Sequence, residues 1–195
     1  MRAAAAAIVC AVLCMGQAPA KAPDIYYAPT RQAVADAMLT LAHVGPDDVV
    51  YDLGSGDGRI VILAAQKYGA RGVGIEIDPA LVARSRTIAE EGGVADRVRF
   101  IEGDLFAANL ADATVVTLYL SASINAQLEP KLRRELKPGT RIVSEQFPIG
   151  QWMPDQTITS TGQTLFLWIV PDPGSRLPPP GSRLPPPATG GSGRR

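Results

Sequence analysis

The sequence predicts a single-domain α/β fold with a doubly wound, mainly parallel sheet that ends in an antiparallel C-terminal hairpin. Three observations support this prediction. Short apolar segments alternate with segments of helical periodicity, as in parallel sheets with helical crossovers. A glycine-rich loop follows the first apolar segment. Near the end of this pattern, Thr161-Gly162 separates two β-rich segments, which indicates a hairpin.

The first helix is predicted over residues 30–42 and the first strand over residues 49–52. Apolar side chains recur at helical spacing in the helix, at Val34, Ala37, Met38 and Leu41. Thr30 is in a position to cap its first turn, and Gly45-Pro46 ends it. The strand is a short apolar run, typical of a strand buried in a parallel sheet.

The same alternation continues along the chain. We predict a second helix over about residues 58–68 and a third that has Pro79 in its first turn. A fourth helix is predicted over residues 124–136 and is ended by Lys137-Pro138-Gly139. Further strands are predicted over residues 72–76, 98–102, 114–120 and 141–146, with hairpin strands at 156–160 and 163–170.

The two ends of the chain differ from its middle. Residues 1–20 resemble a secretory signal peptide: Arg2, then an apolar run that is too short to span a membrane, then Ala18-Pro19-Ala20 as a cleavage site. We therefore predict an exported or periplasmic protein whose folded domain covers residues 21–170. The alternative is a cytoplasmic protein with a misassigned start site. Residues 171–195, which contain a directly repeated GSRLPPP segment, are predicted to be a disordered Pro/Gly-rich tail.

Composition excludes several kinds of chemistry. Both cysteines, Cys10 and Cys14, lie in the leader, and His43 is the one histidine, so we expect no disulfide, no thiolate catalysis and no metal site. Between Asp24 and Val170 there are 13 Lys and Arg residues against 18 Asp and Glu residues, a net charge of −5. A nucleic-acid binder usually carries a basic excess, so no nucleic-acid partner is expected.

The most informative segment is Asp52-Leu53-Gly54-Ser55-Gly56-Asp57-Gly58-Arg59, between a strand and a helix. Its glycines allow a tight turn and the close approach of a ligand at the carboxyl end of the sheet. The spacing G-x-G-x-G differs from the dinucleotide pattern G-x-G-x-x-G, which makes a NAD-linked oxidoreductase the distant alternative. Asp52 would repel a pyrophosphate, but it suits the cationic end of S-adenosylmethionine.

Two further carboxylates follow the next two strands. Glu76 ends the second strand, where a carboxylate can accept hydrogen bonds from both ribose hydroxyls. Asp104 follows the third strand and is placed to accept from the adenine amino group. Each acid alone could be a solvated loop charge. Three acids at successive strand ends, together with the glycine loop, predict a site for S-adenosylmethionine.

Four segments occur in order along the chain: Tyr26–Thr30, Tyr51–Ile60, Gly74–Ile77 and Phe147–Trp152. Their order resembles the class I, Rossmann-like S-adenosylmethionine-dependent methyltransferases. Among these, it is similar to small protein-lysine methyltransferases related to the archaeal broad-specificity and mitochondrial ATP synthase c-subunit enzymes. The resemblance covers about residues 25–152. It implies an enzyme that N-methylates protein lysine by in-line displacement, in which positioning and exclusion of water supply most of the acceleration.

The predicted site residues follow from the loop, the strand ends and this resemblance. The predicted cofactor-binding residues are Tyr27, Pro29, Thr30, Asp52, Leu53, Gly54, Ser55, Gly56, Gly58, Glu76, Ile77, Asp104 and Leu105. The resemblance implies that Phe147, Pro148 and Trp152 line a lysine channel, although ordinary core packing explains Phe147 and Trp152 equally well. Tyr119, at the end of the fourth strand, is the candidate for orienting the amine through its hydroxyl, against the alternative of a packed strand tyrosine.

Two other functions remain open at this point: a methyltransferase for a small molecule or lipid, and an exported non-catalytic module that binds the cofactor or its product.

Overall fold

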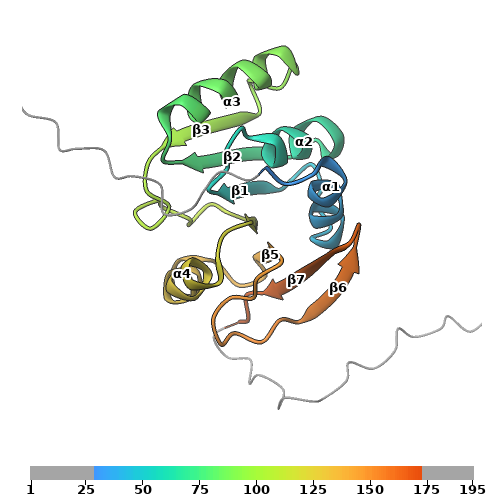
Figure 1. Cartoon of the computed structure of the whole chain (residues 1–195), viewed down its shortest axis with the longest axis vertical. Helices are drawn as coiled ribbons and strands as arrows, with labels where there is room; N and C mark the ends of the chain where they lie inside the picture. The colour runs from blue at the N-terminus through green and yellow to red at the C-terminus, as the bar shows by residue number, and fades with distance from the viewer. Residues whose placement is uncertain (1–28, 173–195) are drawn as a thin grey trace, which may run out of the picture.

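The computed structural model describes residues 29–172. Figure 1 shows the elements in order along the chain. They are α1 (Gln32–Leu41), β1 (Val49–Leu53), α2 (Arg59–Tyr68), β2 (Arg71–Glu76), α3 (Pro79–Glu91), β3 (Val98–Glu102), β4 (Val115–Leu118), α4 (Ala122–Glu135), β5 (Arg141–Glu145), β6 (Gln156–Ser160) and β7 (Gln163–Ile169). The predicted signal peptide lies outside the described residues, as does almost all of the predicted tail.

The strands form one seven-stranded sheet in the order β3-β2-β1-β4-β5-β7-β6. The pairs from β3 to β5 are parallel, whereas β7 pairs antiparallel with both β5 and β6. The predicted fold class is therefore confirmed. The order reverses between β1 and β4, and in open parallel sheets this switch point is where ligands bind.

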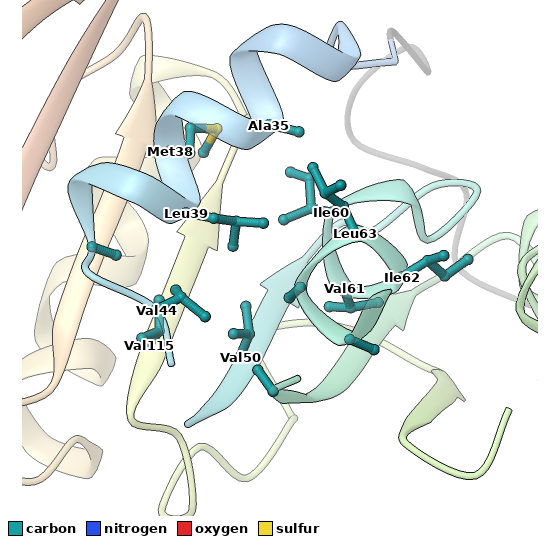
Figure 2. Packing of buried hydrophobic residues seen from close by; sticks show 14 of the residues in the cluster. Ala35, Met38, Leu39, Val44, Val50, Ile60, Val61, Ile62, Leu63 and Val115 are labelled. Atoms are coloured by element: carbon teal, nitrogen blue, oxygen red, sulfur yellow. The ribbon is translucent and has the colours of Figure 1, made fainter. Parts of the chain in front are cut away.

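Helices cover both faces of the sheet, and each face has its own apolar core. One core joins α1, α2 and α3 to the strands; Figure 2 shows α1 and α2 side by side, with Val50 of β1 and Val115 of β4 beneath them. The second core packs α4 and the segment before β4 on the opposite face, around the fully buried Trp168. Because side chains alternate along a strand, β1, β4 and β5 supply residues to both cores.

The predicted cap of α1 is wrong. The helix begins after Arg31, which makes no side-chain capping bond. Thr30 is instead bonded elsewhere: its Oγ1 donates to Glu145 Oε2 at 3.1 Å, at the end of β5. The helix therefore starts one residue later than predicted, and the Thr30 side chain links the segment before it to β5.

Most other element boundaries agree with the prediction to within one residue, and two larger differences lie near the ends of the parallel strands. β4 ends at Leu118, which leaves Tyr119 in the loop that follows it. α4 begins earlier, at Ala122, because Ser121 caps it by accepting from the Ile124 amide at 3.3 Å. Between residues 29 and 172, no helix combines the length and apolar character that a membrane span requires.

Candidate functional site

A cavity of about 710 Å³ lies where the carboxyl ends of the parallel strands meet. It is lined by Pro29, Thr30, Asp52, Gly54, Ser55, Gly56, Asp57, Arg59, Ile60, Ile75, Glu76, Ile77, Asp78, Leu81, Gly103, Asp104, Leu105, Tyr119, Leu120, Ser121, Ile124 and Phe147. The residues come from the ends of β1, β2, β3 and β4 and from the segments around them. The sheet thus brings together chain segments that are far apart in the sequence.

The glycine loop is held in place by Glu76. One carboxylate oxygen, Oε2, accepts from the Gly56 amide at 2.8 Å, and Oε1 accepts from the amides of Ile77 and Asp78 at 2.8 and 3.0 Å. The loop amides of Gly54 and Ser55 both donate to the Ile75 carbonyl at 2.9 Å. Glu76 therefore shapes the cavity through the backbone, and its four lone-pair positions leave capacity for a ribose hydroxyl.

Asp52 lies at the floor of this site. Its side chain is buried, 4% exposed, and Oδ1 accepts from Thr117 Oγ1 of β4 at 2.7 Å. Burial raises the pKa of the Asp52 carboxyl to about 7, and the nearby charges of Glu76 and Asp57 add to this, while the Thr117 bond opposes it. A cationic ligand beside this carboxyl would favour its ionised form.

This raised pKa predicts that affinity for S-adenosylmethionine depends on pH. The raised pKa means that the folded chain binds a proton at Asp52 more tightly than the unfolded chain does. The resulting contribution to stability is complete below the ordinary pKa of 3.8 and is lost as pH rises through about 7. A cation binds the ionised form, so affinity should rise about tenfold from pH 6 to pH 8 and then level off. Calorimetry in two buffers of different ionisation enthalpy measures both the affinity and the proton release. Asp52→Asn should flatten the profile; a wild-type profile without slope contradicts the prediction.

The sequence interpretation missed an ion pair on the wall of the cavity. Arg59, at the start of α2, donates from Nε and Nη2 to both oxygens of Asp57, at 2.9 and 2.6 Å. Its Nη1 also donates to the Thr30 carbonyl at 2.8 Å. The spacing Asp57-x-Arg59 was a signal for this pair. The pair ties the glycine loop to the chain before α1 and balances the positive charge of Arg59 in the cavity.

A second missed group is Glu145, at the end of β5. Its side chain is buried, and burial raises the pKa of the Glu145 carboxyl, while the Thr30 hydrogen bond and the charge of Arg31 oppose the shift. Arg31 itself donates to the Thr161 carbonyl at 2.6 Å. The residues before α1 are therefore anchored to β5 and to the β6–β7 turn.

Most of the predicted cofactor-binding residues line the cavity. They are Pro29, Thr30, Asp52, Gly54, Ser55, Gly56, Glu76, Ile77, Asp104 and Leu105. Leu53 does not, because alternation along β1 turns it into the second apolar core. Gly58 is absent from the cavity wall as well, and Tyr27 lies outside the described residues. The contacts of all these residues with a cofactor stay predictions.

The predicted acceptor residues divide into two groups. Tyr119 and Phe147 line the cavity, whereas Pro148 is exposed outside it. Trp152 is 6% exposed and packs in the second core, 6.5 Å from the Trp168 ring, and its carbonyl accepts from Trp168 Nε1 at 2.9 Å. The structure therefore favours ordinary packing for Trp152, because its ring is buried in the second core.

The residues present fit a cationic sulfur nucleoside. The cavity places buried carboxylates at the end of β1 and β2, the partly exposed Asp104 after β3, and the apolar side chains of Ile77 and Leu105 beside it. Such a combination suits a ribose, a purine and a positively charged tail. Within the described cavity, carboxylates outnumber cationic side chains, which makes it a poor site for a pyrophosphate.

Comparison with known proteins gives the same result. The model of the ANTKMT methyltransferase domain matches residues 52–156. A protein-lysine N-methyltransferase of Saccharolobus islandicus is 40% identical over 153 residues, 76% of this chain and 95% of that protein. The mouse lysine N-methyltransferase of the ATP synthase c-subunit is 40% identical over 129 residues, 66% of this chain but only 51% of its own length. The chain thus spans about half of this mammalian relative.

A solved structure is also similar. It is described as an RNA methyltransferase from Salinibacter ruber in complex with S-adenosyl-L-homocysteine, with a TM-score of 0.74 and 54% sequence identity, covering 78% of this chain and 97% of that one. Its bound product is the demethylated form of the predicted cofactor. The chain belongs to the ANTKMT methyltransferase domain family and is an S-adenosylmethionine-dependent methyltransferase.

Proposed function

We propose that this enzyme methylates lysine side chains of proteins. The observation that carries the proposal is the charge of the cavity: Asp52, Asp57, Glu76, Asp78 and Asp104 line it, against one cationic side chain, which is already ion-paired. A lysine approaches such a site as a cation and is attracted to it. The lysine methyltransferase names of the archaeal and mouse relatives support the same substrate class.

The two ends of the cavity suggest where each reactant binds. The acids at the ends of β1, β2 and β3 suit the cofactor, which supplies an electrophilic methyl group when bound. This leaves the part formed by Tyr119, Ser121 and Phe147 for the acceptor. A reacting amine must be neutral, and an aromatic, poorly hydrated wall disfavours the charged form. The chain then acts mainly by orienting the amine and excluding water.

RNA is the second candidate, because the Salinibacter structure that is 54% identical is described as an RNA methyltransferase. The acidic cavity argues against it, since a phosphate backbone requires cationic partners.

The experiment separates these acceptors with one label. The full chain is incubated with methyl-tritiated S-adenosylmethionine and a cell extract, either treated with nuclease or treated with protease. We expect label in the protein fraction after nuclease treatment and none in the RNA fraction after protease treatment, with mass spectrometry placing the added methyl groups on lysine. The proposal is rejected if the label resists protease, if it is lost with nuclease, or if it appears only in small molecules. Heat-inactivated protein is the control.

We also infer, from the sequence of residues 1–20, that the protein is exported. Mass spectrometry of the native N-terminus decides whether the leader is removed, and cell fractionation decides the compartment.

A further inference from the structure

The start of α4 borders the acceptor part of the cavity. Ser121, its N-cap, and Ile124 both line the cavity. The next residue, Asn125, is fully buried at 0% exposure and is bonded to the end of β5. An amide side chain in such a position has to find partners among the groups around it.

Asn125 and Ser144 both donate hydrogen bonds to the Phe147 carbonyl. Its Nδ2 donates to the Phe147 carbonyl at 3.0 Å and to Ser144 Oγ at 3.1 Å. Ser144 Oγ in turn donates to the same Phe147 carbonyl at 2.7 Å. Asn125 and Ser144 therefore form a closed triangle with the backbone of Phe147, the residue whose side chain lines the cavity.

The backbone at this point is strained and needs such support. Gln146 has a φ of +69°, in the region that non-glycine residues rarely adopt, and its side chain is exposed. The Phe147 amide donates to the Glu145 carbonyl at 2.8 Å, two residues back. This bond together with a positive φ is the rare and strained form of γ-turn. Strained backbone of this kind persists only when the surrounding contacts hold it.

Two more residues of α4, one and two turns further on, hold the rest of the loop. Glu129 Oε2 accepts from the Gln151 amide at 3.1 Å, and Glu129 Oε1 accepts from Arg133 Nε at 2.9 Å. The Arg133 guanidinium lies 3.9 Å from the centre of the Trp152 ring. Residues 125, 129 and 133 share one face of the helix, so α4 fixes the loop along its length.

The Asn125 side chain is incompletely satisfied. Its Oδ1 is buried and has no hydrogen-bond partner within the described part of the chain. A buried acceptor without a donor costs about 1–3 kcal/mol, so the amide is a poor choice for stability alone. Asn125 instead contributes the hydrogen bond that fixes the Phe147 carbonyl.

We propose that Asn125 is a positioning residue, which sets the place of Phe147 at the acceptor side of the cavity. This inference rests on the proposed function in one respect, the use of a lysine side chain as the acceptor. Asn125 acts through Phe147 and touches neither the cofactor acids nor the glycine loop. Its removal should therefore separate acceptor binding from cofactor binding.

The test compares Asn125→Ala with the control Leu132→Ala. Leu132 is a fully buried residue of the same helix, so its truncation leaves a cavity in the core beside α4. Hydrogen exchange by mass spectrometry should accelerate in residues 145–152 of Asn125→Ala and not in those residues of Leu132→Ala. With poly-L-lysine as acceptor, KM should rise about tenfold in Asn125→Ala, while affinity for S-adenosylhomocysteine stays within about twofold. Leu132→Ala should keep both constants near wild type at a temperature where it is folded.

Phe147→Ala and the double variant Asn125→Ala/Phe147→Ala complete a double-mutant cycle. If Asn125 acts through Phe147, the double variant should bind poly-L-lysine no more weakly than Phe147→Ala does. Unchanged hydrogen exchange in residues 145–152 of Asn125→Ala overturns the inference. A KM increase from Asn125→Ala that adds fully to the increase from Phe147→Ala also overturns it. So does a KM increase that comes with an equal loss of affinity for S-adenosylhomocysteine. If the wild type fails to methylate poly-L-lysine or any protein, the proposed function fails, and the exchange experiment still decides whether Asn125 holds the loop.

Discussion

Replacing Glu76 by alanine should abolish measurable binding of S-adenosylhomocysteine while the chain remains folded. Glu76 accepts hydrogen bonds from the amides of Gly56, Ile77 and Asp78. Each bond to a charged acceptor contributes about 1.5–3 kcal/mol, and without the carboxylate these amides lose their partner and the glycine loop loses its shape. The same substitution removes the predicted acceptor of the ribose hydroxyls. We therefore expect affinity to fall by about 100-fold or more.

Glu102 provides a matched control for this experiment. It is the residue aligned with Glu76 on the neighbouring strand β3, and its side chain is exposed and does not line the cavity. Glu102→Ala should leave the affinity unchanged. Glu76→Gln keeps the shape of the side chain but presents an amide group to backbone donors, so it should bind weakly as well. A Glu76→Ala protein that is folded by circular dichroism and binds the product within about threefold of wild type contradicts the assignment.

The parallel part of the fold could be predicted because its central strands are buried on both faces. Such strands are short apolar runs, and those of β1 and β4 stand out against the polar ends of the neighbouring helices. The edge strand β3 is buried on one face only, and its burial alternates accordingly. The positions of Asp52, Glu76 and Asp104 at one edge follow directly, since parallel strands point their carboxyl ends to the same side. The site acids were predictable for a topological reason.

The contacts that cross between distant elements could not be predicted in this way. Thr30 has the residue type of a helix cap but stands one residue before the observed cap, Arg31. Only the packing of α1 beside β5 brings Glu145 within reach of its hydroxyl. Trp152 follows Phe147 by five residues in a segment without periodicity, so the sequence does not say which of the two points into the cavity. The bonds from α4 that decide this, those of Asn125 and Glu129, link residues about 22 positions apart.

The glycines of the loop have more than one physical reason. All three, Gly54, Gly56 and Gly58, have positive φ, as the tight turn requires. The expectation from sequence was that they leave room for a ligand. At Gly58 the structure gives a different reason: an added Cβ would lie 2.6 Å from Cζ of Phe100, a buried ring from β3, and 3.0 Å from Cβ of Ser85 on α3. Gly58 lets the loop pack against the core.

Gly58→Ala should consequently destabilise the whole domain as well as the cofactor site. The φ of +78° is unfavourable for alanine by about 1–2 kcal/mol, and displacement of the Phe100 ring from its packed position adds to this, so we expect a loss of about 3 kcal/mol or more. Chemical denaturation measures the free energy of unfolding, and product titration at a temperature where the variant is folded measures the site. Affinity should fall because Gly58 is the N-cap of α2, directly before Arg59 on the cavity wall.

Two other glycines separate the contributions to this loss. Gly139 has a φ of +81° but open space where its Cβ would lie, so Gly139→Ala should show the backbone penalty alone. Gly45 has neither a positive φ nor a neighbour within 4 Å, so Gly45→Ala should be neutral or slightly stabilising, by up to about 1 kcal/mol. Phe100→Leu in the Gly58→Ala background should recover part of the loss by relieving the overlap. If Gly58→Ala destabilises no more than Gly139→Ala, the ring contact is irrelevant and the backbone turn alone accounts for glycine at this position.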